Sequence, residues 1–147
     1  MKSIILKSIS IALFVLGMQA VSLQAAESVL FLGDFCWRGQ SNSVDQTTGT
    51  LKLGVTQIGS HFPVYGKLTT DEFALVVQGN AETTSQGIEV VLHGAGFNGM
   101  ERIVTTYHLL LNGTLNGSYR SICFESLGGM TPETMTDEGS LAIVPCN

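Results

Sequence analysis

The stretch RIVTTYHLLLNGTLNGSYRSICF, residues 102 to 124, decides the fold of this chain. Two apolar-rich runs lie on either side of Asn112-Gly113, and Asn-Gly between such runs is the strongest short-range signal for a β-hairpin. A type I′ turn at these two residues would set Leu111 opposite Thr114 and fix the register of both strands. We therefore predict a hairpin here and take it as the nucleus of an all-β domain.

The predicted register divides the hairpin into two faces. One face carries Arg120, whose charge favours an outer position, so the opposite face is predicted to point into the domain. The inward face combines aliphatic side chains with four polar or aromatic ones: Thr106, His108, Tyr119 and Ser121.

Short runs of alternating apolar and polar residues recur along the rest of the chain and predict further strands. These runs span residues 29–40, 49–59, 61–69, 73–79, 87–94 and 140–146. Eight strands joined mostly by short connections are typical of an up-and-down barrel or a sandwich. We predict a single antiparallel meander closed into a barrel, because closure removes edge strands, and keep a β-sandwich as the alternative.

The N-terminal segment has the pattern of a secretory signal peptide. Lys2 and Lys7 precede an apolar run at residues 11 to 16, and small residues follow up to Ala25 and Ala26. A retained membrane anchor is the alternative, but the run is shorter than the roughly 20 residues that a span needs. We predict cleavage after Ala25, with Ala26 as the next choice.

Cleavage would divide the chain into a signal peptide, residues 1–25, and a β-barrel domain, residues 26–147. The protein would then be exported to the periplasm or outside the cell, most simply in a bacterium. Loss of both leader lysines leaves five basic residues against twelve acidic ones, so the net charge moves from −5 to −7. An acidic surface disfavours nucleic acid as a partner, and the remaining chain has no apolar run long enough to embed it in a membrane.

The chain contains three cysteines, Cys36, Cys123 and Cys146. Export to an oxidising compartment predicts one disulfide and one remaining thiol. Barrel closure brings the last strand beside the first, so we prefer a bond between Cys36 and Cys146. The pair Cys36 and Cys123 is the second choice.

The predicted barrel interior suggests a site for a small apolar or amphipathic ligand. A few polar groups that converge in an apolar cavity are the usual composition of such a site. The alternative is a filled core, because an eight-stranded barrel is only just wide enough for its own side chains. The candidate ligand-binding residues are Trp37, Thr106, His108, Tyr119 and Ser121.

One segment resembles a known family. LNGSYRS, residues 115–121, is similar to the L-T-G-T-Y-x-S strand of avidin-type barrels, and the early strand with Gly33 and Trp37 resembles the first strand of calycins, although the lipocalin G-x-W spacing is absent. The resemblance implies a calycin-like barrel in which Tyr119 and Ser121 face a ligand. Avidin-type sites use several tryptophans and this chain has one, so the resemblance argues against biotin.

The connections at one end of the predicted barrel are long, at residues 41–48, 94–101 and 125–139. Apolar side chains in exposed loops favour contact with a partner. A protein-interaction module at this rim is therefore the alternative function, with four candidate contact residues: Phe97, Met100, Met130 and Met135.

Catalytic and metal-binding patterns are weaker. His61, His93 and His108 fall on separate predicted strands without metal-ligand spacing, so we predict no metal, no cofactor and no catalytic residue. A hydrolase or isomerase that uses His108 is a third hypothesis, and it requires a nucleophile or acid within hydrogen-bond reach of that ring.

Overall fold

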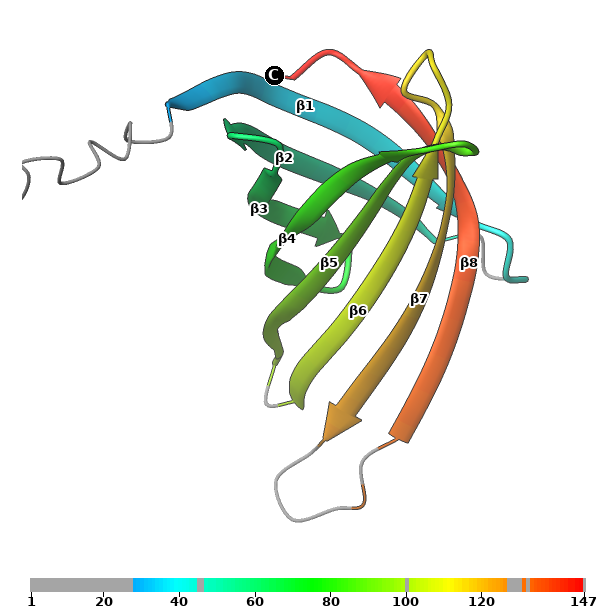
Figure 1. Cartoon of the computed structure of the whole chain (residues 1–147). Helices are drawn as coiled ribbons and strands as arrows, with labels where there is room; N and C mark the ends of the chain where they lie inside the picture. The colour runs from blue at the N-terminus through cyan, green and yellow to red at the C-terminus, as the bar shows by residue number, and fades with distance from the viewer. Residues whose placement is uncertain (1–27, 45–46, 100, 127–130, 132, 147) are drawn as a thin grey trace, which may run out of the picture.

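The chain folds into a closed antiparallel barrel (Figure 1). The structure, a computed structural model, describes residues 28–44, 47–99, 101–126, 131 and 133–146. Each strand pairs with the next in sequence, and the last pairs with the first, which confirms the predicted all-β meander and its closure. No helix in this part of the chain is long and apolar enough to cross a membrane. The strands are β1 (Val29–Ser41), β2 (Thr48–Ile58), β3 (Phe62–Thr70), β4 (Ala74–Thr84), β5 (Gly87–Asn98), β6 (Glu101–Leu111), β7 (Gly117–Ser126) and β8 (Glu133–Val144).

The β6–β7 hairpin has a different register from the predicted one. Leu111 pairs with Gly117 instead of Thr114, so the connection has five residues, Asn112 to Asn116, in place of a two-residue turn. Side chains alternate between the two faces of a strand with a period of two. A shift of three positions therefore exchanges the inner and outer faces of one strand relative to the other. As a result the side chains of β7 face inward and outward as predicted, and those of β6 face the opposite way.

The longer connection is held by side-chain hydrogen bonds that a two-residue turn would lack. The Asn112 Oδ1 atom accepts hydrogen bonds from the Thr114 amide at 2.9 Å and the Asn116 amide at 3.2 Å. Leu115 takes a left-handed φ of 60°. Its carbonyl accepts a 2.7 Å hydrogen bond from the Trp37 indole of β1, which ties the connection to the barrel.

Most described residues of two predicted long connections, 94–101 and 125–139, belong instead to strands. β5 continues to Asn98 and β6 begins at Glu101, and β8 begins at Glu133. Gly94 and Gly96, which suggest a loop in the sequence, pair with Thr105 and Ile103 inside the sheet. A Cβ atom at Gly94 would lie 3.0 Å from the side chains of Thr105 and Val77, so glycine relieves crowding inside the barrel at this position.

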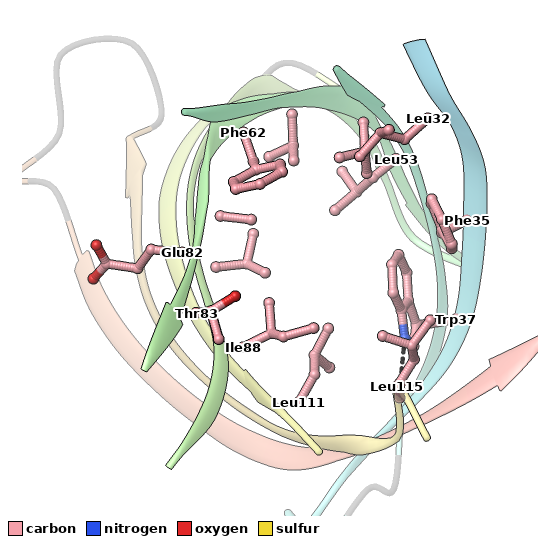
Figure 2. Close-up of a pocket in the computed structure, with 14 residues that line it drawn as sticks. Leu32, Phe35, Trp37, Leu53, Phe62, Glu82, Thr83, Ile88, Leu111 and Leu115 are labelled. Atoms are coloured by element: carbon pink, nitrogen blue, oxygen red, sulfur yellow. Dashed lines mark hydrogen bonds between the residues drawn. The ribbon is translucent and has the colours of Figure 1, made fainter. Parts of the chain in front are cut away.

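The middle of the barrel is filled by a packed layer of side chains, which we call the waist. Its members are exposed by at most 1%: Leu53, Leu75, Val77, Leu92, Ile103 and Leu109. Burial of this apolar surface is the main stabilising contribution to the fold. The waist divides the interior, and Figure 2 shows the side chains at the end that contains Trp37.

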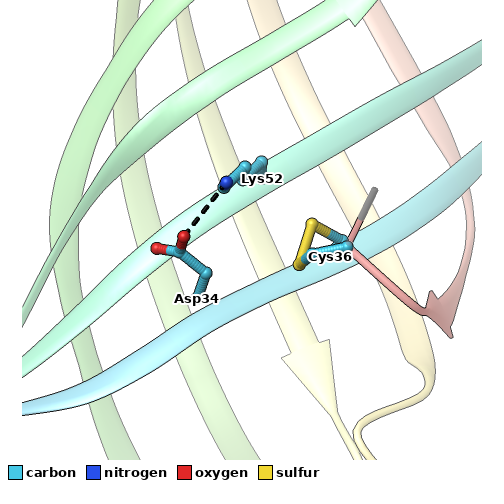
Figure 3. The surroundings of a disulfide bond; sticks show 4 residues. Asp34, Cys36 and Lys52 are labelled. Atoms are coloured by element: carbon cyan, nitrogen blue, oxygen red, sulfur yellow. Dashed lines mark ion pairs between the residues drawn. A yellow bond between two sulfur atoms is a disulfide. The ribbon is translucent and has the colours of Figure 1, made fainter.

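The barrel closes along a seam between β1 and β8. Pairing across the seam runs from Cys36 with Val144 to Ser41 with Gly139, and the first part of β1 pairs with β2 alone. A disulfide joins Cys36 to Cys146 at one end of the seam, with the two Cα atoms 5.2 Å apart, which confirms the preferred pairing. Figure 3 shows Cys36, which is buried under the disulfide on the outer face of β1, beside the ion pair of Lys52 and Asp34, whose charged atoms are 3.0 Å apart.

Candidate functional site

Two cavities of the described barrel lie on opposite sides of the waist. The wide cavity, of about 490 Å³, lies toward the β1–β2 and β3–β4 connections, and its walls include Ser41, Phe73, Tyr107, Tyr119, Ser121 and Asp137. The apolar cavity, of about 210 Å³, lies toward the opposite end, and its walls include Leu32, Phe35, Trp37, Phe62, Ile88 and Leu111. No described residue lines both cavities, so the two are separate.

The five predicted ligand-binding residues do not form one site. Tyr119 and Ser121 line the wide cavity, as the orientation of β7 predicts. Trp37 lies in the apolar cavity, on the other side of the waist. Thr106 and His108 were predicted to face inward, and this prediction is wrong because the shifted hairpin register turns both onto the outer surface.

His108 is exposed on the outside of the barrel. Its Nε2 atom lies 3.5 Å from the Glu89 carboxylate, and the neighbouring His93 contacts Thr106 at 3.2 Å. His108 lines neither of these two cavities, so neither cavity supports the hypothesis of a hydrolase or isomerase centred on this ring.

A network of polar groups forms one wall of the wide cavity. The Asp137 carboxylate accepts a 2.7 Å hydrogen bond from the Tyr119 hydroxyl and a 2.6 Å hydrogen bond from the buried Ser41 hydroxyl. The Ser121 hydroxyl donates to the Asp137 backbone carbonyl at 3.4 Å. These bonds join β1, β7 and β8, so the carboxylate is held in a fixed position at the cavity wall.

Two tyrosines line the wide cavity. Their ring centroids are 6.1 Å apart in a tilted arrangement. Burial raises the pKa of Tyr107 to about 12. Burial, and then the hydrogen bond and negative charge of Asp137, raise the pKa of Tyr119 far above its ordinary value. Both phenols therefore remain protonated at physiological pH.

The wide cavity is acidic. Asp71, Glu72, Glu125 and Asp137 line it, and none of its described lining residues is Lys, Arg or His. Burial raises the pKa of Glu125, and the negative charges of Glu101, Glu72 and Glu133 raise it further. Uncompensated negative charge at this end favours neutral or cationic groups and repels anions.

The raised pKa of Glu125 predicts a pH effect on stability. A carboxyl group whose pKa is higher in the folded state stabilises the fold below its ordinary pKa of about 4, and this contribution is lost as the pH rises through the folded-state value. Glu125→Gln should therefore raise the thermal midpoint at neutral pH and weaken its fall as the pH rises above the ordinary glutamate value of about 4. Glu138→Gln is the control, because Glu138 points outward with its carboxylate 3.4 Å from Arg120. Equal pH profiles for Glu125→Gln and the unmodified protein would contradict this assignment.

The predicted interaction rim is only partly described. Met100 and Met130 lie outside the described residues. Met135 lines the wide cavity and is 43% exposed. Phe97 is 64% exposed, but it lies on the outer surface of β5, beside Arg102 of β6. The described members therefore do not form one surface, and a protein partner at this end stays a prediction.

Sequence reasoning missed two prominent groups of the wide cavity. Tyr107 was placed outside by the incorrect hairpin register, and Asp137 was placed in a loop. The signal for Asp137 is the period of two along β8: Asp137, Gly139 and Leu141 occupy alternate positions, so the inward face of the strand extends back to Asp137.

Comparisons of the chain with protein-family models, with curated proteins and with solved structures found no match.

Proposed function

We propose that this protein is an exported, non-catalytic binding protein that takes a small amphipathic ligand into the wide cavity. The observation that carries this proposal is the composition of the cavity. Its volume of about 490 Å³ is that of a small-molecule site, since such sites span roughly 300–1,000 Å³. Aliphatic side chains such as Leu68 and Leu109 line the same cavity as the fixed polar network of Tyr119 and Asp137.

The disulfide supports export. Bonds of this kind form and persist in oxidising compartments, and the Cys36–Cys146 bond lies at the seam that closes the barrel. The signal-peptide pattern of the first 25 residues agrees with the same destination.

The charge of the cavity narrows the ligand class. An anionic group would meet the Asp137 carboxylate and the other acidic side chains without a basic partner among the described lining residues. The proposed ligand therefore has an apolar body and an uncharged or cationic polar end. The Tyr119 hydroxyl already donates to Asp137, so a ligand amine or hydroxyl would act as a further donor to this carboxylate.

A matched pair of fluorescent probes tests the proposal. N-phenyl-1-naphthylamine is uncharged, and 8-anilinonaphthalene-1-sulfonate has the same ring system with an added sulfonate. The uncharged probe should bind saturably with increased emission, and the sulfonate should bind at least about tenfold more weakly, because like-charge repulsion of a kcal/mol or more acts on it.

Two variants of β7 show where the probe binds. Ser121 is buried and lines the wide cavity, whereas Ser118 on the same strand is exposed on the outer surface. Ser121→Leu should weaken binding of the uncharged probe by about tenfold, because it occupies space that the probe would fill. Ser118→Leu should leave binding unchanged. Equal affinity in the two variants, or stronger binding of the sulfonate, would refute the proposal.

A further inference from the structure

The apolar cavity offers almost no polar group to an occupant. Among its described lining residues only Trp37, Glu82 and Thr83 have polar side-chain atoms. The Trp37 indole N–H already donates to the Leu115 carbonyl at 2.7 Å. The Glu82 carboxylate points away from the cavity in Figure 2, which leaves the Thr83 hydroxyl at the edge.

Water is therefore a poor occupant of this cavity. A water molecule inside a protein needs two to four hydrogen-bonding partners, and an apolar cavity without them stays dry. The aromatic rings of Phe35 and Trp37 stack with centroids 6.2 Å apart and form one wall, and Phe62 lies across the cavity from them (Figure 2). The surface that remains uncovered is hydrocarbon, so the favourable occupant is also hydrocarbon.

The cavity has the size of a small hydrocarbon ligand. Its volume is about 210 Å³, and an apolar cavity of roughly 150 Å³ lined by similar side chains binds benzene or xenon. Leu32 lines the cavity and is itself 43% exposed, and the preceding residues of β1 are also exposed apolar side chains. A hydrocarbon chain can therefore enter along an apolar surface at this end.

We infer that the apolar cavity is a second binding site, which takes the short alkyl chain of a free, uncharged amphiphile such as an alcohol. The chain lies against Trp37 and the polar end stays at the mouth beside Thr83. This site is independent of the wide cavity, because the waist separates the two and no described residue lines both. It therefore does not rest on the function proposed above.

The position of the tryptophan allows a direct test. Trp37 is the only tryptophan in the chain, so its emission reports on the apolar cavity alone. Titration with 1-octanol should change this emission in a saturable way and should raise the thermal midpoint. Absence of a saturable change would overturn the inference. A change with phosphatidylcholine vesicles but none with free octanol would overturn it as well, because the occupant would then belong to a membrane.

Replacement of two alanines on neighbouring strands by leucine locates the ligand. Ala81 of β4 lines the apolar cavity, and Ala95 of β5 is exposed on the outer surface. Ala81→Leu should weaken octanol binding by about tenfold, since displacing about two methylene groups of the ligand forfeits their burial. Ala95→Leu should bind as the unmodified protein does. Equal binding by the two variants would overturn the inference, and their thermal midpoints without octanol establish that both are folded.

A third variant separates this inference from the proposed function. Ser121→Leu fills part of the wide cavity, so it should weaken the naphthylamine probe and leave the octanol response of Trp37 unchanged. Loss of the octanol response in this variant would show that the two cavities are one site and would overturn the inference. Failure of the naphthylamine experiment alone would leave the octanol result intact.

Discussion

Replacement of both Cys36 and Cys146 by serine is expected to lower the free energy of unfolding by about 4–5 kcal/mol. The two residues are 110 positions apart, so the bond encloses nearly the whole barrel as one covalent loop. In the chain-entropy account, a loop of this length strongly restricts the unfolded chain. The bond also joins the strands of the seam, where β1 is paired with β8 only from Cys36 onward.

Urea unfolding followed by circular dichroism checks this expectation. The unmodified protein in a reducing buffer should unfold at the same urea concentration as the double variant, because both lack the bond. Cys123→Ser is the matched control, since Cys123 is a half-buried free thiol in the wall of the wide cavity. A double variant as stable as the oxidised protein would show that strand pairing alone holds the seam closed.

Trp37→Ala is expected to cost about 3–5 kcal/mol, which is the usual range for removal of a buried tryptophan. The side chain is 3% exposed and packs against the core beside Phe35. Its loss also leaves the Leu115 carbonyl without the indole donor. Trp37→Phe should cost less, because it retains a ring and loses mainly the hydrogen bond and part of the volume.

The matched control for Trp37 is Tyr65→Ala. Tyr65 is an aromatic residue on the outer surface of β3 and is 57% exposed, so its removal should change stability by about 0.5 kcal/mol or less. Denaturant midpoints from circular dichroism compare the three variants without relying on tryptophan emission. A cost for Trp37→Ala no larger than that of Tyr65→Ala would contradict the role of Trp37 as a core residue.

The fold follows from local features of the sequence. Alternation along β2, where Leu51 and Leu53 are buried and Lys52 is exposed, specifies both a strand and its inner face. Short connections between successive strands then specify the meander. The disulfide follows from the meander, because only closure places Cys146 near Cys36.

The register of the β6–β7 hairpin could not be obtained in the same way. Both faces of β6 carry large aliphatic residues, such as Leu109 inside and Val104 outside, so hydrophobicity did not select between them. The connection from Asn112 to Asn116 is held by its own hydrogen bonds and also by partners far away in sequence. Trp37 of β1 donates to the Leu115 carbonyl, and the Ile143 amide of β8 donates to the Asn116 side chain at 2.9 Å. Asn-Gly favours a two-residue turn locally, and these tertiary hydrogen bonds favour a longer one.

The candidate site was predictable only in part for this reason. Tyr119 and Ser121 face inward because β7 has the predicted orientation. The predicted inner face of β6 was the wrong one, so Thr106 and His108 were assigned to the barrel interior, where Tyr107 and Leu109 lie. The separation of Trp37 from the tyrosines depends on how the waist side chains pack across the barrel, which no local pattern in the sequence describes.

The Cys36–Cys146 bond also determines how the molecule carries mechanical load. When the chain is pulled by its two ends, tension passes from the segment before Cys36 through the sulfur atoms to the segment after Cys146. The residues between the two cysteines form a closed covalent loop outside this covalent path, and only the hydrogen bonds between residues 29–35 and β2 connect the loop to the loaded segment. A barrel stretched between two attachments would therefore keep its waist and the wide cavity inside the covalent loop until the bond is reduced, whereas Leu32 and Phe35 of the apolar cavity lie in the loaded segment before Cys36.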